Sequence, residues 1–284
     1  MVVAASDSNV AGQICVVTGG GSGIGAALCR KFAALGASHV IVADRDLAAA
    51  TCIANTLAGR GIAQQCDVAD EQDVVRLIES AVAIGPIGVF VCNAGIAKNG
   101  GVEVSNEAWQ QVMNVNVLQN LFCARHLVPR WRSQEGTKHL VITASAAGLL
   151  TSTESLPYSV SKHAAVAFAE WCAIAYQDIG VQVCCLCPQA VDTALLPKDA
   201  SGKPLGGTAG VDGILSPDEV ASCVVEAMME RRFLALPHAS VLKYFRNKAD
   251  NYDRWLGGMR KVRQRFGLTG TGSQRVPSGP VARL

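Results

Sequence analysis

The sequence predicts an α/β fold, a doubly wound parallel sheet in one domain with a helical extension at its C-terminus. Three observations lead to this expectation. Short apolar runs alternate with stretches of helical periodicity, and a glycine-rich turn follows the first run. The chain has 284 residues, half of them hydrophobic and 17% charged, which provides one large buried core but leaves little room for two full domains.

The apolar runs are short and nearly continuous, as expected of strands that helices cover on both faces of a sheet. A helical stretch separates each run from the next, which favours parallel strands joined by crossover helices. We expect strands at Ile14–Val17, Val40–Val42, Ile62–Cys66, Val89–Val91, Leu140–Ile142, Val181–Leu186 and Phe233–Leu236.

The C-terminal part is expected to cover the ends of these strands. Residues 199–213 are rich in small residues, Gly and Pro, and predict a mobile loop over the strand ends. The substrate loop as a whole is expected at about 189–215. Residues 240–266 place apolar residues near helical spacing among basic ones, which favours a packed or oligomer-lining helix over a helix on a membrane surface. We expect one domain over residues 1–266 and a flexible tail at 267–284.

Composition excludes several classes of function. The formal net charge is only +2, which gives no field for nucleic acid, and no apolar stretch is long enough for an integral membrane segment. The eleven cysteines are scattered through apolar runs and read as free thiols. Cys184, Cys185 and Cys187 lie in a strand without a nearby histidine, so no metal is expected. We expect a soluble, intracellular protein.

The glycine-rich turn lies between the first strand and a helix. Bare backbone amides and a helix N-terminus at such a place predict a site for the pyrophosphate of a dinucleotide. Glycine clusters also mark ordinary turns, and the strand-turn-helix context favours the phosphate site. The segment Thr18–Gly25 contributes the candidate cofactor residues Gly19, Ser22, Gly23, Ile24 and Gly25.

Asp44 follows the second expected strand, nineteen positions after Gly25. A carboxylate at that spacing binds an adenosine ribose hydroxyl and repels a 2′-phosphate, so NAD is favoured over NADP. Arg45 is adjacent, but the glycine loop holds no Lys or Arg. The alternative for Asp44 is a helix N-cap for the segment that starts near Leu47.

A second group of residues predicts proton transfer. Tyr158 and Lys162 are four apart and share a helix face, so we expect the ammonium to lower the pKa of the phenol toward neutrality by about 4 kcal/mol of interaction. Pro157 fits the first turn of that helix. Ser145 follows a strand and can donate a hydrogen bond to the same substrate oxygen.

Taken together, these motifs resemble the short-chain dehydrogenase/reductase family, in its shorter single-domain branch. The resemblance covers Gln13–Leu236. It rests on the Thr-Gly-x-x-x-Gly-x-Gly loop, Asp67-Val68, Asn93-Ala94-Gly95, Asn116, Ser145 and, thirteen positions later, Tyr158-x-x-x-Lys162. It implies a Rossmann-type fold and an NAD cofactor.

The resemblance also implies roles for further residues. Asn116, Ser145, Tyr158 and Lys162 would be catalytic, with Lys162 also holding the nicotinamide ribose and Asn116 supporting a water chain that carries the proton. Asp67, Val68 and Asn93 would lie on the adenosine side, and Val191 and Thr193 at the carboxamide. The sequence departs from the family at Gln189, where a glycine usually follows the proline, which puts the local nicotinamide geometry in question.

The function expected is interconversion of a secondary alcohol and a ketone by hydride transfer to or from NAD. The alternative is a catalytically silent NAD-binding regulatory or scaffold protein. A homodimer or homotetramer is implied by the resemblance. The location expected is cytoplasmic, or peroxisomal if the C-terminal Ala282-Arg283-Leu284 acts as a targeting signal in a eukaryote.

Overall fold

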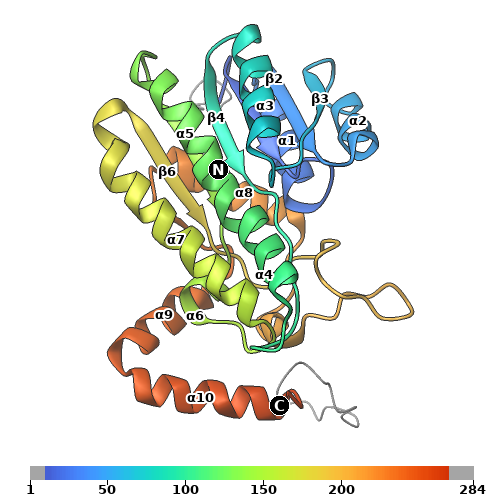
Figure 1. Cartoon of the computed structure of the whole chain (residues 1–284), viewed down its shortest axis with the longest axis vertical. Helices are drawn as coiled ribbons and strands as arrows, with labels where there is room; N and C mark the ends of the chain where they lie inside the picture. Colours follow the sequence, from blue (N-terminus) through green and yellow to red (C-terminus); the bar gives the residue numbers. More distant parts are fainter. Residues whose placement is uncertain (1–9, 269–284) are drawn as a thin grey trace.

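A single parallel sheet of seven strands organises the computed structural model, which describes residues 10–268 (Figure 1). The spatial order is β3-β2-β1-β4-β5-β6-β7, so the order reverses between β1 and β4. Open α/β sheets bind ligands at the carboxyl ends of the strands beside such a reversal. The strands are β1 Ile14–Thr18, β2 His39–Asp44, β3 Gly61–Gln65, β4 Ile87–Cys92, β5 Lys138–Thr143, β6 Val181–Leu186 and β7 Leu234–Ala235.

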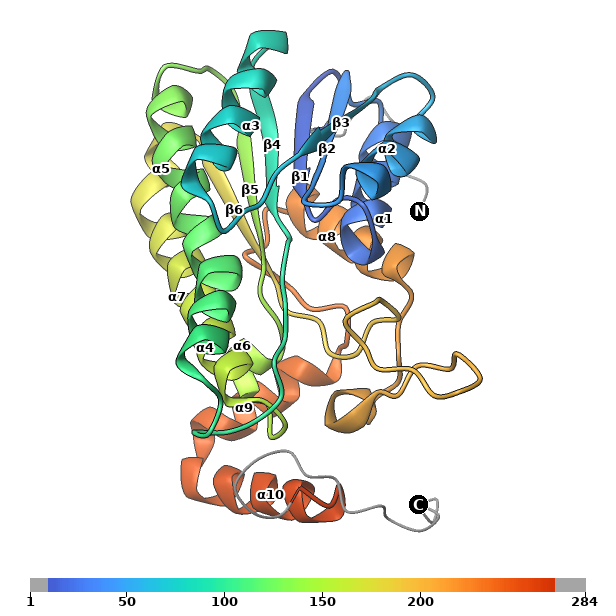
Figure 2. The ribbon, with the colours of Figure 1, turned by 45° about the vertical axis from the view of Figure 1, so that its right-hand side comes forward.

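Helices cover both faces of the sheet (Figure 2). One core cluster joins the sheet to α3, α5 and α7, and the other joins it to α1, α2 and α8. The doubly wound fold is therefore confirmed. The helices are α1 Gly23–Ala34, α2 Leu47–Asn55, α3 Glu71–Ile84, α4 Asn106–Met113, η2 Asn114–Leu118, α5 Gln119–Arg132, α6 Ala147–Leu150, α7 Leu156–Tyr176, η3 Gln177–Ile179, η4 Gly207–Gly210, α8 Pro217–Met229, α9 Ser240–Asp250 and α10 Tyr252–Arg265.

The expectation of one C-terminal helix is wrong. The chain breaks at Asn251, whose backbone is extended (φ −156°, ψ 95°), into α9 and α10. The Asn251 side chain accepts a hydrogen bond from the Arg254 amide at 2.9 Å and so caps α10. Asparagine favours such caps over helix interiors, and this local bond competes with continued helix.

The segment over the strand ends, residues 189–215, is irregular, but hydrogen bonds attach it to the rest of the domain. It forms an isolated bridge between Val191 and Leu215 and the short η4 turn. The Thr208 amide donates a hydrogen bond of 2.7 Å to the Glu154 carboxylate, which ties η4 to the loop before α7. The loop is therefore attached at its middle as well as at its ends.

Two predictions fall outside the described residues: most of the tail at 267–284, and the Ala282-Arg283-Leu284 signal. Within residues 10–268, none of the helices is long and apolar enough to cross a membrane. All eleven cysteines lie within the described residues, and all are free thiols.

Candidate active site

A cavity of about 1440 Å³ lies at the carboxyl ends of the strands. Single drug-sized ligands occupy pockets of roughly 300–1,000 Å³, so this volume suits a dinucleotide together with a substrate. It is lined by all but two of the site residues predicted from the sequence, namely Gly19, Ser22, Gly23, Ile24, Asp44, Asp67, Val68, Asn93, Ser145, Tyr158, Lys162, Val191 and Thr193. The other two, Gly25 and Asn116, lie behind its wall.

The glycine loop forms one end of the cavity. Gly19 has a φ of +62°, and a Cβ there would lie 2.9 Å from the Ala94 backbone. Helix α1 starts at Gly23, and its N-cap Ser22 makes no side-chain capping bond. The first amides of α1 are therefore left without a capping side chain, which is the arrangement that binds a phosphate group.

Tight backbone packing places this loop against the rest of the site. A Cβ on Gly25 would lie 2.1 Å from the Gly19 carbonyl oxygen, so the helix approaches the strand through a bare backbone. A Cβ on Gly23 would meet the Thr193 methyl group at 2.9 Å. Thr193 thus faces the glycine loop across the cleft where a dinucleotide would pass.

Asp44 ends β2 and lines the same end of the cavity. One carboxylate oxygen accepts a hydrogen bond from the Gly21 amide at 3.0 Å, and the other accepts one from the Asp46 amide at 3.1 Å. The N-cap of α2 is Asp46, whose side chain accepts from the Ala48 and Ala49 amides. The alternative of Asp44 as the cap is therefore wrong, because the residue two positions later takes that place.

Asn93 ties three strand ends together. Its side-chain amide donates to the carbonyls of Thr18 and Gly19, at 3.1 and 3.3 Å, and its side-chain oxygen accepts from the Thr143 hydroxyl at 3.2 Å. These bonds place Asn93 between the glycine loop and the strand that leads to Ser145. In this structure the side chain supports the adenosine-side wall through the backbone.

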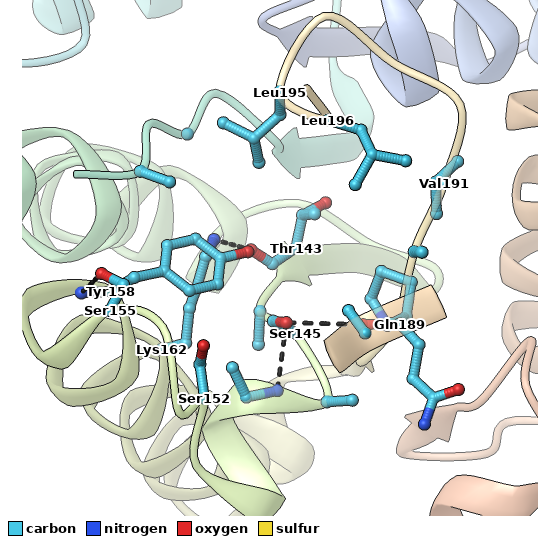
Figure 3. A pocket seen from close by; sticks show the side chains of 18 of the residues that line it. Thr143, Ser145, Ser152, Ser155, Tyr158, Lys162, Gln189, Val191, Leu195 and Leu196 are labelled. Carbon is cyan, nitrogen blue, oxygen red and sulfur yellow. Dashed lines mark hydrogen bonds between the residues drawn. The ribbon is translucent and has the colours of Figure 1, made fainter. Parts of the chain in front are cut away.

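Tyr158, Ser145 and Lys162 converge in the middle of the cavity (Figure 3). Helix α7 begins at Leu156, with Ser155 as the cap that accepts from the Tyr158 amide at 3.1 Å, so Tyr158 stands in its first turn as predicted. The Ser145 hydroxyl donates to the Pro188 carbonyl at 3.4 Å. Lys162 is 3% exposed, and its ammonium donates to the Thr143 carbonyl at 2.7 Å.

The expected pKa of Tyr158 needs correction. Burial raises the pKa of the phenol above its usual value, while a hydrogen bond with Ser145 works in the opposite direction. Burial also lowers the pKa of the Lys162 ammonium to about 8. Four-residue spacing places the two side chains on one face, but the ammonium is directed to the Thr143 carbonyl, so its charge does not bring the phenol toward neutrality here.

Asn116 sits in η2, a single π-helical turn between α4 and α5. Such turns often mark functional sites because they rotate a side chain out of the regular helical register. Its amide nitrogen donates to the Ile96 carbonyl at 2.9 Å and to the Ser161 hydroxyl at 3.0 Å, and its oxygen accepts from the Ile96 amide. A Cβ on Gly95 would lie 3.5 Å from both the Asn116 oxygen and the Lys162 nitrogen, so the two groups flank one point of the wall.

The Gln189 side chain points away from Tyr158 and Ser145 (Figure 3). Its backbone amide donates to Nδ1 of buried His238 at 3.2 Å. Burial raises the pKa of the nearby Asp212 carboxyl, but hydrogen bonds with Ser240, Gln189 and Tyr244 together hold that pKa below its usual range. Gln189 therefore fastens the turn after β6 to the C-terminal segment instead of filling the nicotinamide side of the cleft.

Sequence reasoning missed several residues that build the site. Thr143 and Ser161 receive hydrogen bonds from Lys162 and Asn116, and Glu154 holds the substrate loop. Their partners are distant in sequence or depend on loop geometry, so no spacing rule points to them. Ser155 carries a signal, a serine three positions before the amide that it caps.

Comparisons with known proteins agree with this geometry. The family model described as short chain dehydrogenase matches residues 13–203, more than half of the chain. A 1-deoxy-11-beta-hydroxypentalenate dehydrogenase of Streptomyces exfoliatus is 35% identical over 83% of this chain and 86% of its own length. A 2,5-dichloro-2,5-cyclohexadiene-1,4-diol dehydrogenase of Sphingobium indicum is 34% identical over 67% of this chain and 77% of its own length.

A solved structure gives the same answer. A short chain dehydrogenase/reductase from Burkholderia phymatum, in complex with NAD, superposes with a TM-score of 0.78 at 28% identity, covering 97% of this chain and 99% of that one. The chain therefore belongs to the short-chain dehydrogenase/reductase family, and the resemblance drawn from its motifs is confirmed.

Proposed function

We propose that the chain catalyses the reversible oxidation of a secondary alcohol to a ketone with NAD, and that Tyr158 exchanges the hydroxyl proton. One observation carries the proposal: Tyr158, Ser145 and Lys162 meet in the same cavity as a glycine loop fit for a dinucleotide. The two relatives named above are dehydrogenases and a solved relative is in complex with NAD, which favours an enzyme over a silent scaffold.

The residues present fit NAD. The uncapped first turn of α1 would hold the pyrophosphate, Asp44 the adenosine ribose, and Val191 with Thr193 the carboxamide. Asp67 and Val68 line the cavity next to Asp44 and would border the adenine. When bound, the nicotinamide accepts or gives the hydride.

The chain's own residues manage the proton. The Tyr158 oxygen takes the proton from the alcohol and returns it to the ketone in the reverse direction. The hydrogen bond from Ser145 to the Pro188 carbonyl is long at 3.4 Å, so little is lost when this hydroxyl turns to a substrate oxygen. Lys162 would bind the nicotinamide ribose. Asn116 would support a water chain that carries the proton from the active site to solvent.

The substrate class proposed is a cyclic secondary alcohol. The wall facing Tyr158 is apolar, with Leu195 and Leu196 on it (Figure 3), and Leu150 also lines the cavity. Such a wall suits a hydrocarbon ring, since apolar contact stabilises binding in proportion to the area removed from water. Two matched relatives carry names of ring alcohol substrates, which supports the same class.

Assembly and location are further parts of the proposal. Trp171 and Ile174 of α7 are 60% and 84% exposed, and Leu121 of α5 is also exposed. Large apolar groups on neighbouring helices favour burial in a homodimer or homotetramer. The location proposed is cytoplasmic, or peroxisomal in a eukaryote; a fluorescent fusion with a free C-terminus should then lose peroxisomal signal when Ala282-Arg283-Leu284 is removed.

The activity test uses the purified full chain with NAD and a panel of cyclic and open-chain secondary alcohols. NADH absorbance should rise with cyclic alcohols and much less with open-chain ones. A protein that binds NAD in calorimetry but turns over none of the panel, and reduces none of the matching ketones with NADH, would favour the scaffold alternative.

A further inference from the structure

The cavity continues beyond Tyr158 to the junction of α9 and α10, which lie at the foot of the molecule (Figure 2). At this end of the cavity, apolar side chains lie on α10 and polar side chains lie around the junction of α9 and α10. Trp255, Met259 and Val262 of α10 supply apolar wall. Asn247, Asn251 and Arg254 supply polar groups around the junction.

Arg254 is the feature that the proposed dehydrogenase chemistry does not use. Its side chain forms no hydrogen bond or ion pair with any of residues 10–268, although it lines the cavity. Two other cations of these helices already bind backbone groups. Lys248 donates a hydrogen bond to the Leu149 carbonyl at 2.6 Å, and Arg263 donates one to the Thr153 carbonyl at 2.9 Å. Arg254 is exposed and lines the cavity beside an apolar wall, so a ligand in the cavity can replace the water at its guanidinium.

The charge distribution gives an independent reason. Residues 240–265 hold eight Lys and Arg residues against two Asp residues, whereas the whole chain has a net charge of only +2. The remaining sequence is therefore acidic on balance, and the positive potential is concentrated at this end of the cleft. Of these eight cations Arg254 lines the cavity, and the positive potential of the surrounding helices favours the approach of an anionic substrate.

The carboxylates near this end do not cancel that charge. Glu154 accepts the Thr208 amide at 2.7 Å and is committed to holding the loop. Asp250 also lines the cavity, at the end of α9, but it is not paired with Arg254. An acidic group would therefore bind on the Arg254 side of the junction.

We propose that Arg254 is an anion subsite, and that the substrate is a ring alcohol carrying a carboxylate at the end remote from the reacting carbon. The proposal rests on the proposed dehydrogenase function. Guanidinium pairs with a carboxylate through two parallel hydrogen bonds, which fixes orientation as well as affinity. Arg254 thus determines which end of the substrate enters toward Tyr158.

The cavity itself favours a long substrate. Tyr158 stands in the first turn of α7, whereas Arg254 belongs to α10, and the cavity of about 1440 Å³ extends from one to the other. The subsite therefore suits a substrate longer than one ring, such as a fused-ring hydroxy acid, over a small hydroxy acid.

The test compares each acid with its own methyl ester. One pair is a 3-hydroxysteroid with a side-chain carboxylate, and the other is 4-hydroxycyclohexanecarboxylate. For the steroid pair, kcat/KM should be at least about tenfold higher for the acid, mainly through KM, since a hydrogen bond to a charged group is worth about that factor or more. The smaller pair should show little difference because it cannot reach both sites.

Arg254→Gln should lower kcat/KM for the steroid acid by about tenfold to a hundredfold and leave the ester unchanged. Arg254→Lys should restore part of the loss, because the charge returns without the bidentate geometry. The matched control is Arg260→Gln. Arg260 is an exposed cation of the same helix that does not line the cavity, so this variant should change kcat/KM for neither the acid nor the ester.

Equal kcat/KM for acid and ester in the unmutated enzyme, or an equal loss for both in Arg254→Gln, would overturn the subsite while turnover of the ester still supports the dehydrogenase. If no alcohol is turned over, calorimetric binding of the steroid keto acid and its ester in the presence of NADH decides. A Kd for the acid no tighter than for the ester, or unaffected by Arg254→Gln, would then count against the subsite.

Discussion

The Lys162 ammonium lies 5.6 Å from the centre of the Tyr158 ring and donates its hydrogen bond to the Thr143 carbonyl. The end of β5 thus fixes the position of the lysine, and the phenol stays neutral in the free protein because burial raises its pKa. A neutral phenol can donate to a ketone oxygen directly. To accept a proton from an alcohol, it must first ionise, which makes the oxidation direction the more pH-sensitive one.

Tyr158→Phe should lower kcat/KM by about 10²–10⁴, the usual contribution of a positioned general acid or base. The fold should remain, since the Ser155 cap bonds the backbone amide of residue 158 and not its side chain. NAD affinity, measured by calorimetry, should change little. Retention of most activity on the true substrate would show that another group exchanges the proton.

Lys162 should make the cofactor-free protein more stable at high pH. Burial lowers its pKa from the ordinary 10.5 to about 8 in the folded state, so the folded state gives up its proton first as the pH rises. The unfolded state then binds more protons, and the free energy of unfolding increases between pH 8 and 10.5. The full effect is about 3 kcal/mol for a shift of this size.

The Lys162→Met variant isolates this contribution from the buried cysteine thiols, which titrate in the same range. Urea unfolding at several pH values should show the unmutated protein gaining about 3 kcal/mol relative to the variant across that window. A constant difference between the two proteins would mean that Lys162 keeps its ordinary pKa. Activity of the variant should be strongly reduced, with weaker NAD binding.

The sequence predicted the sheet well because buried parallel strands are continuous apolar runs, such as Val181–Leu186, which matches β6 in full. The predicted bounds of the edge strand β3 were one residue too late. Gly61–Gln65 has no fully buried residue, so its apolar pattern is weaker than that of the central strands. Most of the motif residues met in one cavity because they follow a strand end, as Asp44, Asn93 and Ser145 do, or begin the helix after it, as Tyr158 does. That placement is a consequence of topology and is readable from order along the chain.

Other parts of the site could not be predicted in this way. The direction of the Lys162 ammonium depends on the Thr143 carbonyl, a backbone group without a residue signature. The break at Asn251 depends on whether its side chain caps a new helix or the helix continues. The free-energy difference between these two outcomes is too small to predict from the spacing of apolar residues. Arg254 was one basic residue among many until the fold placed it on the cavity.

Gln189→Gly should leave NAD affinity nearly unchanged, because the Gln189 side chain points away from the cleft (Figure 3). The substrate KM should rise by up to about fivefold, since removing one hydrogen bond that fastens the turn to Asp212 costs about 1 kcal/mol. The control is Gln182→Gly, a glutamine of β6 that does not line the cavity. A large loss of NAD affinity in Gln189→Gly would place this side chain at the nicotinamide after all.

Asp44 should make the enzyme prefer NAD over NADP by at least about tenfold in kcat/KM. A 2′-phosphate would place two negative charges against a carboxylate that already accepts the Gly21 and Asp46 amides. Hydrogen bonds to charged groups are worth about 1.5–3 kcal/mol, so losing one and adding repulsion exceeds a factor of ten. The comparison needs both cofactors at saturating substrate.

Two variants separate charge from shape at this site. Asp44→Asn keeps an oxygen for the Gly21 amide and removes the repulsion, so it should erase most of the preference with little change in stability. Asp44→Ala should also erase it but lower Tm, because the loop amide loses its partner. Arg45, which lines the same cavity, is then free to meet the phosphate. Equal kcat/KM for the two cofactors in the unmutated enzyme would mean that Arg45 already neutralises Asp44.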